Sequence, residues 1–203
     1  MRHYLQTALH WGIRLAALCV GLALVFPAWA YDVPLSESSI RDAYYLGTRA
    51  TTLGPDFLRE YTQNVPELKV GRFTSVVRLE TPFSQVAAAS AKKMGFSAQD
   101  VVNEFRGKPL AFRISMDICY KIDVPENAVR VKVFQNKKEI VPESYDSSPY
   151  YPAADKYTRV SSIGEKVEME FKPNKIESST LLIVIDTPDG QHAEIAFDLR
   201  ALR

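Results

Sequence analysis

The hydrophobic pattern of the chain changes near Gly107-Lys108-Pro109, and this change constrains the fold more than any other feature. Before it, apolar residues recur at the spacing of amphipathic helices. After it, they alternate with polar residues, as in strands that bury one face. We therefore expect an α+β protein in which a helical N-terminal segment packs on a C-terminal antiparallel β-sandwich of immunoglobulin-like type.

The segment before residue 107 carries the marks of helix starts. Pro55 and Pro82 stand where a first helical turn tolerates proline, and Ser97 with Asp100 matches a capping box. Lys92-Lys93 is expected on a solvated helix face. Residues 72–80 instead alternate between apolar and polar, which predicts a strand that pairs elsewhere in the chain.

The segment after residue 108 reads as a series of strands. Alternating patterns cover residues 110–119, 129–133, 167–171 and 193–199, with a weaker one over 157–163. Residues 181–185 are apolar throughout, so this strand is expected to be covered on both faces. Thr187-Pro188-Asp189-Gly190-Gln191 follows and is typical of a hairpin turn.

Residues 1–30 have the order of a secretory signal peptide. A basic start without acidic residues precedes an apolar stretch over 15–26, and Ala28-Trp29-Ala30 supplies a cleavage site. The mature chain is expected to begin at Tyr31 and to be periplasmic or extracellular, in a bacterium. The apolar stretch is shorter than the roughly 20 residues that span a bilayer, so a retained anchor is the less favoured alternative.

The expected organisation is a signal peptide at 1–30, a mostly helical region at 31–107 with one strand near 72–80, and a β-sandwich domain at 108–203. No segment of the mature chain is apolar enough to be expected to cross a membrane. Loss of Arg2 and Arg14 with the leader changes the formal net charge from +1 to −1. A near-neutral chain is not expected to bind nucleic acid.

The mature chain holds one cysteine, Cys119, so no internal disulfide is expected and stability must come from packing. We expect Cys119 to fill space in a half-buried position, with a reactive thiol as the alternative. His192 is the one histidine of the mature chain, which disfavours metal sites built on several imidazoles. The motifs of nucleophile elbows, phosphate loops and dinucleotide folds are missing, so we expect no metal, no cofactor and no assigned catalytic residue.

One polar pair offers a catalytic alternative. If residues 188–190 form a three-residue loop with Gly190 in the left-handed conformation, Asp186 lies opposite His192 and Glu194 shares its face. A carboxylate beside an imidazole raises its pKa and orients it as a general base. The favoured interpretation is an ordinary polar pair at a solvated hairpin end.

A candidate binding surface lies in residues 142–159, where prolines and acidic residues accompany several tyrosines. The tyrosines are Tyr145, Tyr150, Tyr151 and Tyr157. Tyrosines on a proline-stiffened loop present rigid contact area to a glycan or a protein. The alternative is a structural loop whose tyrosines pack back on the sandwich.

Together these patterns predict an exported, periplasmic, non-catalytic binding or accessory protein whose partner is an envelope protein or a glycan. One alternative is a carboxylate-dependent hydrolase that uses Asp186 and His192. The other is a structural subunit of an envelope assembly that is completed through an exposed sheet edge, such as residues 72–80.

Overall fold

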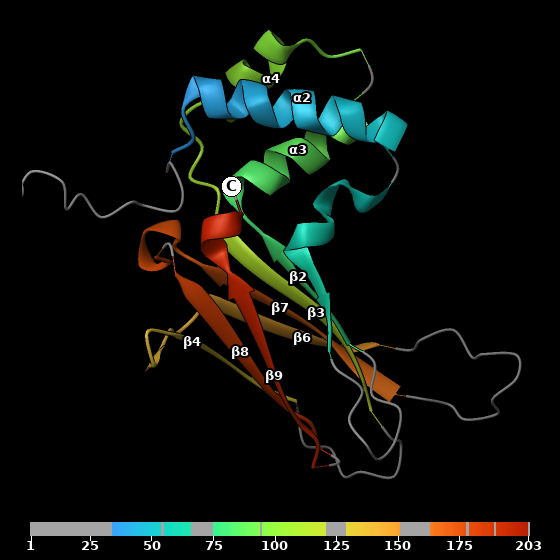
Figure 1. The fold of residues 1–203 in the computed structure, drawn as a ribbon, viewed down its shortest axis with the longest axis vertical. Helices are drawn as coiled ribbons and strands as arrows, with labels where there is room; N and C mark the ends of the chain where they lie inside the picture. Colours follow the sequence, from blue (N-terminus) through green and yellow to red (C-terminus); the bar gives the residue numbers. More distant parts are fainter. Residues whose placement is uncertain are drawn as a thin grey trace, which may run out of the picture.

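The computed structural model describes residues 34–65, 75–120, 129–150 and 163–202, except residues 54, 94, 178 and 189. Over these residues the chain has an α+β organisation, with a helical layer at one end of two antiparallel sheets (Figure 1). The expected signal peptide lies outside the described residues. Within them, no helix is long and apolar enough to cross a membrane.

The helical layer contains α2 (Glu37–Leu53), α3 (Pro82–Lys92) and α4 (Ala98–Phe105). Two of these helices start as the sequence indicates, since Thr81 caps α3 and the capping box of Ser97 and Asp100 opens α4. Helix α2 crosses over α3 and α4 (Figure 1). The three helices bury an apolar core of their own, made of Ile40, Ala43, Phe83, Val86, Ala87, Val101 and Val102.

The larger sheet has the strand order β1-β2-β3-β7-β6 and the smaller sheet the order β5-β4-β8-β9, with every neighbouring pair antiparallel. The strands are β1 (Thr62–Asn64), β2 (Ser75–Glu80), β3 (Phe112–Tyr120), β4 (Arg130–Gln135), β5 (Lys138–Glu139), β6 (Ser144–Tyr150), β7 (Ile163–Phe171), β8 (Thr180–Asp186) and β9 (His192–Asp198). Short 3-10 helices are η1 (Pro55–Tyr61), η2 (Pro173–Lys175) and η3 (Leu199–Ala201).

The inner faces of the two sheets share a second and larger hydrophobic core. Alternate residues of β3 and β8 are fully buried in it: Phe112, Ile114, Met116, Ile118, Leu181, Ile183 and Ile185. The rings of Phe112 and Phe171 meet edge to face, with centroids 6.3 Å apart. The period-two patterns over 110–119, 167–171 and 193–199 therefore identify the buried faces of β3, β7 and β9 correctly.

The expectation that residues 181–185 are covered on both faces is wrong for the described chain. Leu182 and Val184 lie on the outer face of the smaller sheet and are only half-buried, whereas their neighbours along β8 are fully buried. An apolar run is compatible with either arrangement, because the residues themselves do not specify what covers the outer face.

The expected strand near 72–80 is present as β2 over Ser75–Glu80, but it is not a free edge. It pairs with β3 along its length and with β1 over Val76–Arg78. The region 142–159 also differs from the expected loop, because Ser144–Tyr150 forms the edge strand β6. Pro149 is tolerated there because an edge strand leaves one side without ladder hydrogen bonds.

Gly47 provides a test of the packing between α2 and α3. A Cβ atom at this position would stand 2.1 Å from the carbonyl oxygen of Ala87. Alanine normally stabilises a helix relative to glycine, but here the added methyl group meets rigid backbone. We expect Gly47→Ala to lower the free energy of unfolding by roughly 1–3 kcal/mol, measured by urea denaturation. A gain in stability, as helix propensity alone implies, would contradict this packing.

Candidate functional site

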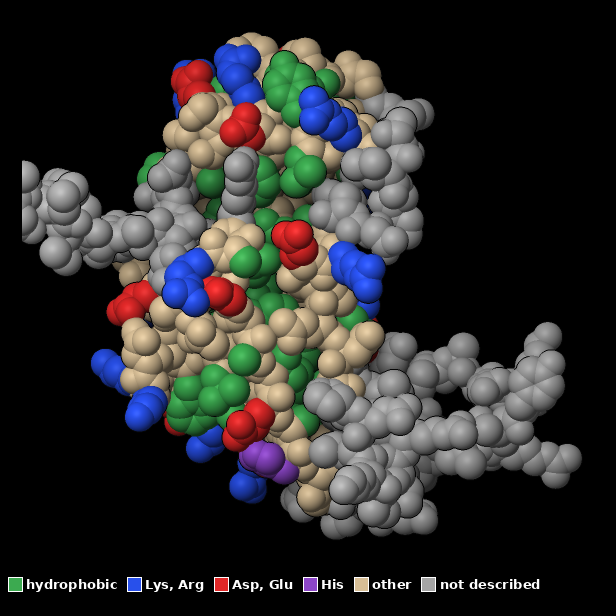
Figure 2. All heavy atoms as spheres, viewed as in Figure 1, with side chains coloured by type: hydrophobic (Ala, Val, Ile, Leu, Met, Phe, Trp, Pro, Cys, Tyr) green, Lys and Arg blue, Asp and Glu red, His purple; other side chains and the backbone are tan. Residues whose placement is uncertain are grey.

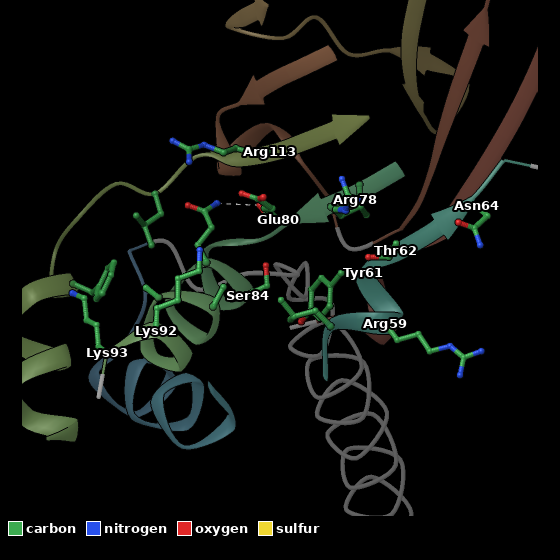
Figure 3. Close-up of a pocket in the computed structure, with 17 residues that line it drawn as sticks. Arg59, Tyr61, Thr62, Asn64, Arg78, Glu80, Ser84, Lys92, Lys93 and Arg113 are labelled. Carbon is green, nitrogen blue, oxygen red and sulfur yellow. Dashed lines mark hydrogen bonds between the residues drawn. The ribbon is translucent and has the colours of Figure 1, made fainter. Parts of the chain in front are cut away.

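A cleft of about 850 Å³ lies between the helical layer and the edge of the larger sheet (Figure 3). Its walls come from η1, β1, β2, α3, the end of α4 and the beginning of β3. This volume lies within the range of pockets that hold small molecules, and such pockets often form where two units meet. The cleft is therefore the candidate site.

The junction between β2 and α3 lies in the wall of the cleft. Thr81 connects the two elements and is fully buried; its hydroxyl accepts a hydrogen bond from the Ser84 amide at 3.1 Å. The Ser84 hydroxyl in turn donates to the Thr81 carbonyl at 3.0 Å. The Gln85 side chain donates to the carbonyls of Glu80 and Ala111, at 3.1 and 2.6 Å. These bonds tie the start of α3 to both β2 and the segment that enters β3.

The wall of the cleft is mostly apolar. Its apolar residues are Leu58, Tyr61, Leu79, Ala88, Ala89, Phe105 and Leu110. Ala88 and Ala89 are small, so the side of α3 that faces the sheet leaves space that larger side chains would fill. The apolar body of a ligand would replace water against this wall.

Cations predominate among the charged residues that line the cleft. Among the described residues of the lining, five side chains are basic (Arg59, Arg78, Lys92, Lys93 and Arg113), and one, Glu80, is acidic. Three of the cations are neutralised within the chain: Arg78 pairs with Asp117 at 2.9 Å, Arg113 with Glu170 at 2.7 Å, and Lys93 with Glu104.

Lys92 is the cation best placed to meet a ligand. Neither Lys92 nor Arg59 forms an ion pair within the described ranges. In Figure 3, Lys92 extends from α3 toward the part of the cleft where Glu80 lies, whereas Arg59 points away from it. The expected solvated face of α3 thus includes a lysine at the opening of the cleft.

Among the described residues, neither the candidate tyrosines nor the Asp186–His192 pair lines this cleft, whereas Arg78, Leu79 and Glu80 of the candidate edge 72–80 do. The lining residues come from several separate segments, and no motif connects them. The small residues at Ala87–Ala89, followed by Lys92-Lys93, are the one local trace of the site, and the same pattern describes an ordinary helix face.

Of the four candidate tyrosines, Tyr145 and Tyr150 stand at described positions of β6. Tyr145 is 44% exposed and stands opposite Met169; its hydroxyl donates to the Val129 carbonyl at 3.3 Å. Partial burial, with a contribution from Glu165, raises the pKa of the Tyr145 hydroxyl. Tyr150 pairs with Gly164 at a position on the opposite face of β6 from that of Tyr145. Tyr151 and Tyr157 lie outside the described residues.

The hairpin before β9 has the geometry that the sequence predicts. Gly190 has a φ of 83° and Thr187 pairs with Gln191, so Asp186 stands opposite His192. Nδ1 of His192 donates to Asp186 at 2.7 Å, and Nε2 lies 3.5 Å from Glu194. All three side chains are exposed, and no hydroxyl or thiol of the described chain is bonded to the imidazole. A catalytic role of the pair stays a prediction.

Cys119 is half-buried on β3, opposite Gly164. Burial, followed by the negative charge of Asp117, raises the pKa of its thiol. A raised pKa lowers the thiolate fraction at neutral pH, and the thiolate is the reactive form. This environment favours the space-filling interpretation over the reactive one.

Comparisons of the chain with protein-family models, curated proteins and solved structures find no match. The residues of the cleft and their chemistry therefore carry the functional argument.

The imidazole of His192 provides a pH test. Its pKa is raised, first by the hydrogen bond to Asp186 and then by that to Glu194. The contribution of the protonated imidazole to the stability of the folded state is therefore complete below the ordinary pKa of 6.5. It is lost as pH rises through the higher pKa of the folded state. We expect NMR titration of residues 31–203 to show a pKa of His192 above 6.5 that Asp186→Asn lowers more than Glu194→Gln does. Equal effects of the two variants would contradict the geometry.

Proposed function

We propose that the protein is an exported, non-catalytic binding protein that holds, in the cleft beside α3, a small ligand with an anionic group and an apolar body. The observation that carries this proposal is the pairing of an alanine-lined apolar wall with an excess of cations. The wall would bury the apolar body of the ligand, while Lys92 would bind its anionic group.

Binding is better supported than turnover. The described lining contains neither histidine nor cysteine, and the hydroxyl of Ser84 is occupied in the turn that begins α3. The Asp186–His192 pair, which a hydrolase would use, lies on the hairpin of the smaller sheet and does not line the cleft. A bound ligand would therefore meet groups that hold it but no nucleophile activated by a base.

We also propose that the two sheets are an immunoglobulin-like sandwich. The strand order β2-β3-β7-β6 corresponds to strands A-B-E-D of that fold, and β5-β4-β8-β9 corresponds to C′-C-F-G. Strand β1 would then be an addition at the edge of the first sheet. Such sandwiches are common in binding and cell-surface domains, which agrees with a binding function.

Our proposal of export rests on the signal-peptide pattern of residues 1–30, which favours the bacterial envelope or the outside of the cell. An envelope protein or a glycan remains our proposed larger partner, with the tyrosine-rich residues 142–159 as its candidate contact. The ligand in the cleft and this partner would be bound by different parts of the chain.

Anilinonaphthalene sulfonate, which joins an anionic group to an apolar body, is a suitable probe of the cleft. We expect the folded mature chain to bind it, and Lys92→Glu to raise its Kd about tenfold, because the variant loses a charge-assisted contact and gains repulsion. Fluorescence titration measures both constants. Lys175→Glu is the matched control, since Lys175 is exposed on η2 and does not line the cleft.

A substitution that fills the cleft provides a second test of the same site. Ala89→Leu should reduce probe binding at least as much, whereas Ala201→Leu, at an exposed position on η3, should leave the Kd unchanged. Circular dichroism verifies that each variant is folded. If Lys92→Glu and Ala89→Leu both bind the probe as the unmodified chain does, the cleft is not the binding site.

A further inference from the structure

The outer face of the smaller sheet carries an apolar patch that the cleft does not explain. Phe134 of β4 and Leu182 and Val184 of β8 are half-buried there and line a shallow depression of about 690 Å³. Hydrophobic side chains gather on this part of the visible surface, with charged groups around them (Figure 2). We refer to Phe134, Leu182 and Val184 as the β8 patch.

The outer face of the larger sheet shows what a solvated face looks like in the same protein. The side chains that line its groove are mostly charged, and include Arg78, Arg113, Lys166, Glu168 and Glu170. An antiparallel sheet usually keeps polar residues on the face that meets water. The β8 patch departs from that rule, and an apolar patch with a polar rim is typical of an interaction surface.

The charges around the β8 patch are divided between its two sides. Arg130 and Lys132 on β4, with Lys137 in the turn that follows, make one side basic, although Lys132 lies 3.9 Å from Glu139 of β5. Glu194 and Asp198 on β9 make the other side acidic, although Arg200 pairs with Asp198 and Nε2 of His192 lies 3.5 Å from Glu194. In the register of the sheet, Lys132, Val184 and Glu194 stand in one row across the three strands.

We propose that the β8 patch binds a second copy of this chain, in a two-fold dimer whose axis runs along β8. Rotation about that axis brings β4 of one copy over β9 of the other, so Lys132 faces Glu194 of the partner subunit, and Leu182 and Val184 meet their own copies. An axis perpendicular to the strands would set β4 on β4 and oppose like charges. The charge division therefore selects the first arrangement.

This dimer and the proposed ligand site are independent, because the β8 patch and the cleft share no residue. An isologous interface repeats each contact twice, so a single charge reversal acts on two ion pairs at once. Because of the same symmetry, a double variant that exchanges the two charges, Lys132→Glu with Glu194→Lys, restores both ion pairs.

Sedimentation of the mature chain at a series of concentrations tests the dimer. We expect dimerisation that depends on concentration. Lys132→Glu alone or Glu194→Lys alone should raise the Kd of the dimer about tenfold or more, and the double variant should return the Kd to within about threefold of the original value. Lys166→Glu, a reversal on the outer face of the larger sheet, is the matched control and should leave Kd unchanged.

A substitution in the β8 patch tests the apolar part of the interface. Leu182→Gln should weaken the dimer while the circular dichroism spectrum and the cleft's binding of anilinonaphthalene sulfonate are retained. A chain that stays monomeric at every concentration overturns the proposal. So does a dimer that none of these substitutions weakens, or a double variant in which the two losses simply add.

Discussion

The arrangement of the molecule depends on the hydrogen bonds of Gln85. Its amide donates to the carbonyl of Glu80 at the end of β2 and to that of Ala111 before β3, so one side chain joins the start of α3 to two neighbouring strands. Without it, both carbonyls would need other partners near the helix start. Thr81 and Ser84 complete the junction. The helical layer is therefore attached to the sheet end by directed bonds rather than by a shared apolar core.

The separation of the two cores explains why a cleft exists at all. The helices bury one cluster among themselves and the sheets bury another, and the space between them is lined by alanines and by the ends of long polar side chains. Filling that space with larger apolar residues would gain burial, at about 25 cal/mol for each Å² removed from water. With Ala88 and Ala89 at these positions, the chain lacks this stabilisation. A ligand that occupies the space would explain why the residues are small.

The sequence predicts the parts of this fold that depend on local patterns. The capping box at Ser97, the hairpin that sets Asp186 opposite His192, and the buried faces of β3 and β9 all follow from spacings of a few residues. The cleft could not be predicted in this way, because it depends on where α3 lies relative to β2 and η1. Strand β6 could not be predicted from the sequence for a different reason. Ser147, Ser148 and Pro149 have low strand propensity, and only the edge of a sheet accepts them.

The apolar run in β8 shows how a wrong expectation can still be informative. Residues 181–185 predict burial on both faces, and the described chain provides it on one. Natural sequences rarely place local preference against the final structure without a compensating role. If Leu182 and Val184 served only the single chain, polar residues would satisfy the outer face equally well, as they do on the larger sheet. The residues on β8 are therefore better explained by a surface that becomes buried when a second molecule binds.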